Sequence, residues 1–516
     1  MLRSSIKPIV SFHSKVSLTR AYLNSTTRSM SSSSSTKGAT SASASGKSEE
    51  VEEDVVLFKN ENSARLIVLN RPRKLNSLNT EMINLITPRL IEYSKSTSNN
   101  VIILTSSLPK SLCAGGDVAS CAIEILKDNP LYPSDFFQQE YNLNYLISTY
   151  PKPYVALMDG ITMGGGVGLS VHAPFRVATQ TTKLAMPEMD IGFFPDVGTT
   201  FFLPRLDDKI GYYYALSGDI LSGLDAYFAG FATHYIKSEN KEALIKRLSV
   251  LKPPVINNVK TTTNEILSNQ QEYFALVNNA IEEFSETKLP EDYKFPLSPE
   301  DITIIKQAFS QPTIKDVFKF LEGRKDNFSK TLLEKLTNKP LSSLNIAYEL
   351  LKLGEKNSIK SQFKQELIAA TNIVNIPAKE NDFVLGVSHK LIDKIKLPAY
   401  PTWHNGNVSE TFIKSILKSS IKTTKSLSEP YIKSFFGVDF DQYPHHMGLP
   451  SNQQVADYIT GNDGSGRSYL PTPNEVHKYF AKTTNNKLGV EAKINQILQV
   501  HGEASKYDNK YVSWKA

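Results

Sequence analysis

The chain has 516 residues, with 58 Lys and Arg, 52 Asp and Glu, and a formal net charge of +6 at pH 7. This length suits one large domain with a substantial extension. Its two cysteines, Cys113 and Cys121, exclude a disulfide framework, and no apolar stretch reaches the length of a membrane span.

Residues 1–48 carry the excess positive charge. They contain seven of the 58 basic residues, no Asp or Glu, and many Ser and Thr. This composition is typical of a mitochondrial transit peptide followed by a Ser-rich linker, with cleavage expected between residues 20 and 48. The other 51 Lys and Arg are balanced by the 52 Asp and Glu. The sequence therefore predicts a mitochondrial location and gives no reason to expect nucleic-acid binding by the folded part.

Three apolar runs of strand type, 66–69, 101–105 and 154–158, each lead into a turn and a helix start. The turns read LNRPRKLNSLN, SLCAGGDV and GITMGGGVGLS. A strand that ends in small residues before a helix leaves backbone N–H groups unpaired, and these suit an oxygen that gains negative charge. One donor from each of the two glycine-rich loops would form an oxyanion hole for a thioester carbonyl. The alternative is that the glycines only permit tight turns.

A fourth fragment, AMPEMDIGFFPDVG, supplies two carboxylates, Glu188 and Asp196. Because Pro195 limits helix continuation, Asp196 can return to the cleft that holds Glu188. Thioester hydrolysis needs a carboxylate that takes a proton from water or attacks the carbonyl itself. Glu188 is the candidate, as base or as nucleophile, and Asp196 is the candidate for binding a substrate hydroxyl or orienting the water. Alone, either acid could be a solvated surface charge, but Phe193 and Phe194 argue against a fully solvated face.

Strands and helices alternate from about residue 54 to about residue 240, and helices dominate afterwards. Apolar residues at three-four spacing predict helices at 265–284, 299–309, 314–321 and 342–353, and a terminal helix at 488–501. The stretch 414–425 is rich in Lys and Ser, and it fits either a basic contact surface or a solvated helix face.

Several other motifs are absent or weak. The glycines at 160, 164, 165, 166 and 168 do not satisfy G-x-G-x-x-G, and no P-loop, H-E-x-x-H or G-x-S-x-G pattern occurs. His445 and His446 have no other metal ligand close in sequence and are interpreted as a surface-loop pair. Cys113 has no nearby His and is interpreted as a packing residue. We therefore expect no metal and no cofactor.

Taken together, LNRPRKLNSLN, CAGGD, GITMGGGVGLS and the run 186–198 resemble the enoyl-CoA hydratase/isomerase (crotonase) superfamily. The resemblance implies an α/β fold, a crotonase-like spiral of β-β-α turns with a helical C-terminal region. It implies a crotonase-like catalytic core at 49–240, a helical C-terminal part at 241–410, and a fungal-type extension at 411–516, after the transit peptide and linker at 1–48.

Within the superfamily the chain is most similar to the branch that hydrolyses acyl-CoA thioesters. This implies hydrolysis of 3-hydroxyisobutyryl-CoA in valine catabolism, with coenzyme A as part of the substrate. The positions that match the branch are the oxyanion donors Gly116 and Gly165, the catalytic Glu188 and Asp196, and the substrate-binding residues Glu140, Gly165, Glu188, Asp196, Lys74, Leu75, Asn76 and Ala114. Of these, 74–76 match the place where family members meet the adenosine and phosphate end of coenzyme A.

The resemblance also brings alternatives. Hydratases of the superfamily carry a glutamate three residues after the middle glycine of the triplet, and Gly168 at that position opposes a hydratase or isomerase. Fungal chains of this kind are also counted among small-subunit proteins of the mitochondrial ribosome, so a structural role, with or without turnover, is the alternative function. The closing motif at 382–393 has Leu385 and Ser388 in place of the family's Glu and Arg. Whether the chain forms a homo-oligomer is left open.

Overall fold

The computed structural model describes residues 54–254, 263–395, 399–404, 408–419 and 431–515. The transit peptide and linker expected at 1–48, and residues 420–425 of the Lys- and Ser-rich stretch, lie outside the described residues. In the described ranges, no helix has both the length and the apolar composition that crossing a membrane requires.

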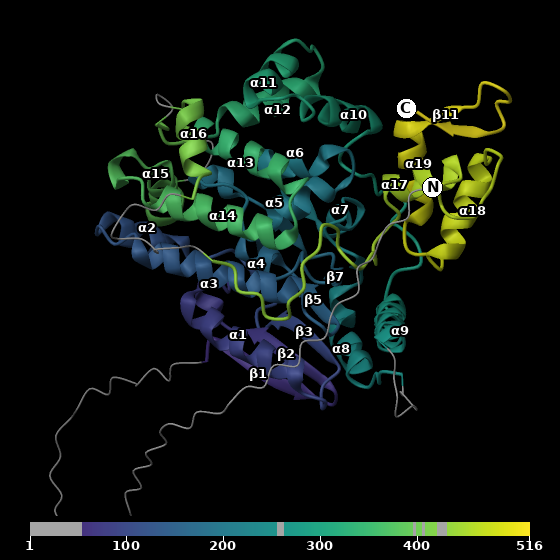
Figure 1. The fold of residues 1–516 in the computed structure, drawn as a ribbon, viewed down its shortest axis with the longest axis horizontal. Helices are drawn as coiled ribbons and strands as arrows, with labels where there is room; N and C mark the ends of the chain where they lie inside the picture. The colour runs from purple at the N-terminus through teal and green to yellow at the C-terminus, as the bar shows by residue number, and fades with distance from the viewer. Residues whose placement is uncertain (1–53, 255–262, 396–398, 405–407, 420–430, 516) are drawn as a thin grey trace, which may run out of the picture. The chain divides into compact units, whose positions relative to one another are not determined.

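Six strands form the larger sheet (Figure 1). In spatial order they are β1 Val56–Glu61, β2 Ala64–Leu69, β3 Val101–Ser106, β5 Tyr154–Met158, β7 Phe175–Ala178 and β10 His234–Tyr235. β1 pairs antiparallel with β2, and the other pairs are parallel. The three apolar runs of the sequence are therefore β2, β3 and β5, which are almost fully buried, as expected for parallel strands covered on both faces.

The smaller sheet completes a spiral. It contains β4 Ser111–Cys113, β6 Ile161–Met163, β8 Lys183–Ala185 and β9 Leu221–Ser222, in that order. β3, β5 and β7 lead after short turns into β4, β6 and β8, and a helix follows each time: α2 Val118–Leu126 and α3 Leu131–Ser148, then α4 Gly165–Gly168, then the 3-10 turn η2 Glu188–Ile191. This arrangement confirms the predicted spiral of β-β-α turns.

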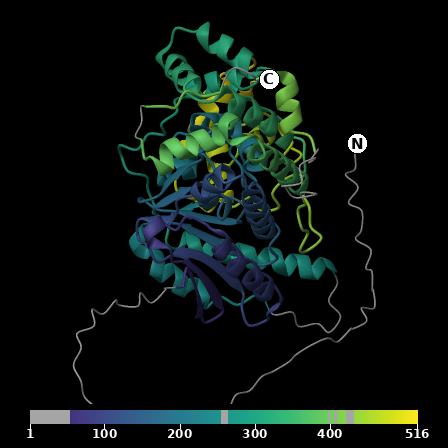
Figure 2. The ribbon, with the colours of Figure 1, turned by 90° about the vertical axis from the view of Figure 1, so that its left-hand side faces the viewer.

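Side chains of the larger sheet alternate between two hydrophobic clusters, because successive residues of a strand face opposite sides. Ile102 and Leu104 of β3 belong to the main core, which includes residues of α1 Thr80–Lys95 and α3. Val101 and Ile103 belong to the second cluster, with residues of α8 Lys241–Ser249 and α9 Thr263–Glu282. The two views of the ribbon show these helices beside the strands (Figures 1 and 2).

The region after the spiral is helical, as predicted. Its helices are α10 Pro299–Ala308, α11 Ile314–Glu322, α12 Asn327–Thr337, α13 Leu341–Gly354, α14 Ile359–Val374, α15 Asp382–Val387 and α16 Glu410–Ile416, with a π-helical turn η7 at Ser388–Ile392. α9, α10, α11 and α13 match the predicted helices closely. α12 and α14 are additions, and α14 packs against α3.

The extension has two parts. Residues 431–447 contain no regular helix or strand, and several of their apolar side chains, including Ile432 and Phe440, join the main core. The rest, which we call the C-terminal lobe, contains α17 Asn452–Thr460, α18 Pro473–Thr483, α19 Val490–His501 and a hairpin of β11 Gly502–Ala504 and β12 Val512–Trp514, with a hydrophobic cluster of its own. α19 confirms the predicted terminal helix. The boundaries at residues 240 and 410 stay predictions.

His445 and His446 lie in an irregular segment, as predicted for a loop, but His445 is half-buried. Its ring stacks on Phe274 with centroids 4.2 Å apart, and burial lowers its pKa to about 4. His446 is exposed.

Candidate active site

The glycine loops and the predicted carboxylates meet in one cavity of about 110 Å³. Its wall includes Ala114, Gly116, Glu140, Gly165, Glu188 and Asp196. These residues come from the loop after β4, from α3, from the start of α4, from η2 and from the loop that follows η2. The spiral therefore brings together residues that are up to 82 positions apart in sequence.

Gly116 and Gly165 present their backbones side by side. A Cβ on Gly165 would lie 3.1 Å from the backbone N of Gly116 and 2.5 Å from Oε1 of Glu140, so no side chain fits there. In the described part of the chain, neither N–H has a hydrogen-bond acceptor. Two unpaired N–H groups at a cavity wall can bind an oxygen that carries negative charge.

Glu140 and Glu188 are buried with incomplete hydrogen bonding. Glu140 is 1% exposed and Glu188 is 6% exposed. Oε1 of Glu140 and Oε2 of Glu188 have no hydrogen-bond partner in the described structure. Burial, and next the charge of Asp196, raise the pKa of both carboxyls well above its usual range. Such groups are candidates for proton transfer.

Asp196 is the third carboxyl of the cavity. Burial raises its pKa to about 7, although the Tyr141 hydroxyl donates a hydrogen bond of 2.7 Å to Oδ2 and opposes the shift. Because like charges so close together disfavour one another, the three carboxyls do not all ionise at neutral pH.

The space beside Gly168 is occupied by the side chains of Val197 and Asn144. A Cβ on Gly168 would lie 2.6 Å from Cβ of Val197 and 3.0 Å from Nδ2 of Asn144. A glutamate at this position would require the Asp196 loop to move. The absence of a side chain at Gly164 makes room for the Glu188 carboxylate, because a Cβ there would lie 2.7 Å from Oε1 of Glu188.

Lys74, Leu75 and Asn76 do not line the cavity, unlike Ala114. Lys74 and Leu75 are exposed at the turn η1 Pro72–Lys74. Asn76 is buried, and its side-chain NH2 donates to Ser106 Oγ at 2.7 Å and to the Leu112 carbonyl at 3.1 Å. The Asn76 side chain therefore fixes the turn, and contact of residues 74–76 with coenzyme A stays a prediction.

The sequence reasoning missed the cations around η2. Asp190 forms ion pairs with Lys339, which is 5% exposed, and with Lys390 at 2.8 Å. Although burial raises the pKa of Asp190, the two lysines lower it below its ordinary value. Lys390 also lines the cavity and opposes the upward shift at Glu188. One feature of the sequence drew attention to this segment: Lys390 lies two residues after Ser388, which stands in the closing motif where the family has Arg.

Cys113 is fully buried, and its thiol donates to the Gly115 carbonyl at 3.5 Å. Burial raises its pKa to about 12, so the thiol agrees with a packing role. In the described ranges, no group of three or more His, Cys, Asp and Glu is placed to hold a metal ion.

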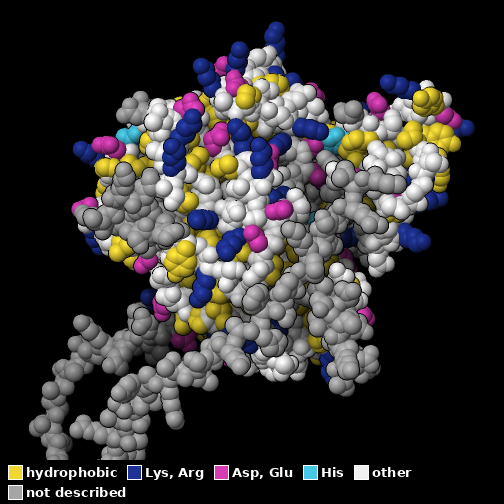
Figure 3. All heavy atoms as spheres, in the orientation of Figure 1, with side chains coloured by type: hydrophobic (Ala, Val, Ile, Leu, Met, Phe, Trp, Pro, Cys, Tyr) yellow, Lys and Arg dark blue, Asp and Glu magenta, His cyan; other side chains and the backbone are white. Residues whose placement is uncertain are grey.

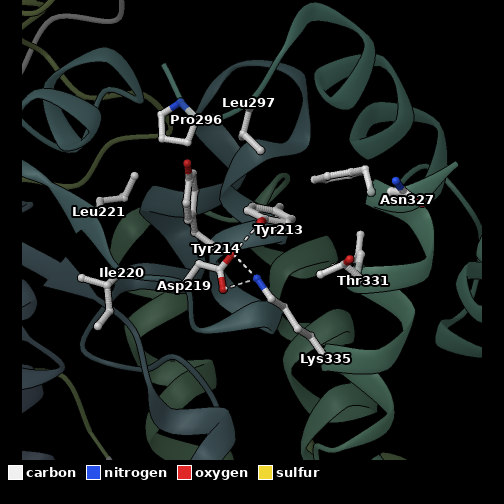
Figure 4. Close-up of a pocket in the computed structure, with 12 residues that line it drawn as sticks. Tyr213, Tyr214, Asp219, Ile220, Leu221, Pro296, Leu297, Asn327, Thr331 and Lys335 are labelled. Atoms are coloured by element: carbon white, nitrogen blue, oxygen red, sulfur yellow. Dashed lines mark hydrogen bonds and ion pairs between the residues drawn. The ribbon is translucent and has the colours of Figure 1, made fainter. Parts of the chain in front are cut away.

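A larger cavity of about 460 Å³ lies elsewhere, between the loop after α6 Ile210–Ser217 and α12 (Figure 4). Asp219 and Lys335 point toward each other there, with Nζ 2.7 Å from Oδ1, and the Tyr213 hydroxyl also bonds Asp219. Both charges are thus paired, and none of the predicted site residues lines this cavity. The smaller cavity is the better candidate active site.

A sequence model of the enoyl-CoA hydratase/isomerase family matches residues 64–417. The small ribosomal subunit protein mS47 of Neurospora crassa is 36% identical over 489 residues, covering 90% of this chain and 88% of that protein. The mitochondrial 3-hydroxyisobutyryl-CoA hydrolase of Danio rerio is 38% identical over 364 residues, covering 70% of this chain and 89% of that protein.

Among solved structures, a carnitinyl-CoA dehydratase from Mycobacterium thermoresistibile matches with a TM-score of 0.60 and 28% identity, covering 75% of this chain and 100% of that one. The relatives support the mitochondrial location predicted from residues 1–48.

Proposed function

The chain belongs to the enoyl-CoA hydratase/isomerase family, and on this basis we propose that it hydrolyses the thioester of 3-hydroxyisobutyryl-CoA. The observation that carries the proposal is the composition of the cavity. It combines two unpaired glycine N–H groups with Glu188 and Asp196, whereas the second glutamate of a hydratase is replaced by Gly168 against a filled wall.

The carbonyl oxygen of the thioester binds between the N–H groups of Gly116 and Gly165. When water adds to the carbonyl carbon, this oxygen becomes anionic, and both donors then bind it more strongly than in the ground state. Loss of one such donor typically costs about 3 kcal/mol of transition-state stabilisation.

Glu188 acts on the other side of the carbonyl. As a general base it takes a proton from the attacking water; as a nucleophile it forms a mixed anhydride that water then cleaves. In both routes the C–S bond breaks and the thiolate of coenzyme A takes up a proton. Asp196, oriented by Tyr141, holds the substrate hydroxyl or the water, and a protonated Glu140 can donate a hydrogen bond.

The cavity size supports a short acyl group. Phe137 and Phe193 stack with centroids 5.1 Å apart, and both line the cavity of about 110 Å³. A branched four-carbon acyl group is compatible with this volume, whereas a long acyl chain needs these rings to move. Short branched acyl-CoA thioesters are therefore the substrate class that this wall favours.

The test is release of free thiol from 3-hydroxyisobutyryl-CoA by the chain without residues 1–48. Glu188→Gln should reduce kcat by about 10²–10⁴-fold, because it removes the proton acceptor or nucleophile and keeps the shape. Binding of coenzyme A should change little. A variant that keeps most of the wild-type rate contradicts the role of Glu188, and an inactive wild-type chain contradicts the proposed hydrolase.

A second candidate function is that of a structural component of the mitochondrial small ribosomal subunit. The match to the ribosomal protein of Neurospora crassa covers so much of the chain that it extends into the C-terminal lobe. The family match ends at residue 417. Co-sedimentation of the chain with small subunits from a mitochondrial lysate tests this function, which is compatible with turnover.

A further inference from the structure

The backbone next to Asp196 adopts an unusual conformation. Val197 has a φ of +55°, and Gly198 follows with +80°. A left-handed φ is rare for a β-branched residue, and it persists only where the surroundings hold it in place. Because Asp196 immediately precedes Val197, whatever holds this backbone also sets the direction of the Asp196 carboxyl.

Two buried groups hold the loop. His172 Nε2 donates to the Val197 carbonyl at 2.8 Å. Glu366 of α14 accepts from the backbone N–H of Gly198 at 2.6 Å and from that of Thr200 at 2.9 Å. Both His172 and Glu366 are almost fully buried.

The tautomer of His172 is decisive for the first contact. A carbonyl only accepts, so Nε2 must carry the proton. Burial lowers the pKa of His172 to about 4, and the neutral ring therefore has an unprotonated Nδ1. The hydroxyl of Tyr443 lies 2.7 Å from Nδ1 and donates to it. Tyr443 thus satisfies Nδ1 in the tautomer that the Val197 carbonyl requires, and this second hydrogen bond orients the His172 ring.

Tyr443 comes from residues 431–447, beyond the end of the family match at residue 417. This segment is tied to the core at several points. Its Phe440 carbonyl accepts from the N–H of Ile359 at 2.9 Å, its Val438 carbonyl accepts from the Tyr145 hydroxyl at 2.5 Å, and the ring of Tyr443 packs edge-on against Phe201 at 5.4 Å. These contacts hold the Tyr443 side chain in a fixed position beside His172.

We propose that Tyr443 is a positioning residue for catalysis: through His172 it fixes the backbone at Val197 and so aims the Asp196 carboxyl into the acyl cavity. This inference rests on the proposed hydrolase function. By this route the segment 431–447 of the extension contributes to the geometry of the active site, although no residue of the segment lines the cavity.

The first test is Tyr443→Phe, which removes only the hydroxyl. We expect kcat to fall about tenfold or more with KM changed less than about twofold, since small displacements of a catalytic group reduce turnover more than binding. Tyr145→Phe is the matched control, because it also removes a hydroxyl that binds this segment but does not touch His172. Equal kcat values for both variants, reduced or not, overturn the proposal.

A double-mutant cycle tests the route through His172. His172→Gln should itself reduce kcat, and adding Tyr443→Phe to it should cost nothing further, because the contact that Tyr443 controls is already gone. If Tyr443→Phe lowers kcat equally in the His172→Gln background, Tyr443 acts in another way and the proposal is wrong.

A measurement without turnover separates this inference from the proposed function. In ¹⁵N-histidine spectra of the wild-type chain, His172 should show a protonated Nε2 and an unprotonated Nδ1 that accepts a hydrogen bond, and Tyr443→Phe should shift the Nδ1 resonance because it removes that donor. An unchanged His172 spectrum overturns the inference even if the enzyme is active. An altered spectrum in a chain that releases no thiol supports the positioning contact and refutes only the hydrolase function.

Discussion

The space beside Gly168 opposes a glutamate of the kind that hydratases of the superfamily carry. Because a Cβ at this position would lie 2.6 Å from Cβ of Val197, Gly168→Glu should lower the free energy of unfolding by about 1–3 kcal/mol or more. It should also create no hydratase activity, since the added carboxylate displaces the Asp196 loop. Thermal unfolding and an enoyl-CoA hydration assay measure both effects.

Gly323→Glu is the control for this substitution. A Cβ on Gly323 meets its nearest neighbours at 3.5 Å, so the added side chain should be tolerated. Appreciable hydration by Gly168→Glu would show that the pocket is closer to that of a hydratase than its geometry indicates.

Ionisation of the buried Asp196 carboxyl should lower the free energy of unfolding at high pH. Burial raises its pKa from 3.8 to about 7, so the folded protein holds the proton more tightly than the unfolded chain does. The stabilisation by this proton is complete below about pH 4 and is lost as the pH rises through 7. Asp196→Asn should therefore stabilise the protein by roughly 1–4 kcal/mol at pH 8 and by much less at pH 5. Thermal unfolding of both proteins across this range is the measurement; an equal difference at the two pH values contradicts it.

At the scale of elements, η2 depends on the pairing of Asp190 with Lys339 and Lys390. The net effect of burial and of the two lysines is to lower the pKa of Asp190, so its stabilising contribution is present above about pH 4 and is lost as the pH falls below that value. Asp190→Asn should lower the melting temperature at pH 7, with a difference that shrinks in acid. It should also reduce thiol release, because Glu188 begins the same turn. A uniform loss of stability at all pH values would mean that the ion pairs are not responsible.

The sequence predicted elements better than it predicted contacts between them. Apolar runs and three-four spacing are local, and they correctly indicated β2, β3 and β5 and the helices α9, α10, α11, α13 and α19. Glu188 and Asp196 could be brought to one cleft because a short proline-containing segment joins them. Glu366 and Tyr443 gave no such signal, since their partners lie 168 and 271 positions away. A buried carboxyl or a tyrosine hydroxyl is recognised only once tertiary packing shows what it faces.

At the scale of the whole molecule, the C-terminal lobe has its own hydrophobic cluster and is joined to the core by polar side-chain contacts. His501 bonds Asp208 at 2.9 Å, and Lys487 pairs with the partly buried Glu282. Apolar side chains are visible on the surface of this lobe in Figure 3, and its exposed aromatic residues include Tyr469, at 62%, and Tyr507, at 98%. No residue of this lobe lines the candidate active site. Its exposed aromatic residues are therefore better suited to binding a partner than to catalysis.

We expect ribosome association and turnover to be separable by mutation, because the exposed tyrosines of the lobe do not line the cavity. Tyr469→Ser with Tyr507→Ser should reduce co-sedimentation with small ribosomal subunits about tenfold, since loss of each central aromatic contact typically costs more than 1 kcal/mol. Thiol release should be unchanged, because neither residue touches the core or the segment that carries Tyr443. Glu188→Gln should show the opposite pattern, with turnover lost and co-sedimentation kept. If both variants lose both properties, the lobe and the cavity do not act independently; if neither affects co-sedimentation, the ribosomal contact lies outside these two tyrosines.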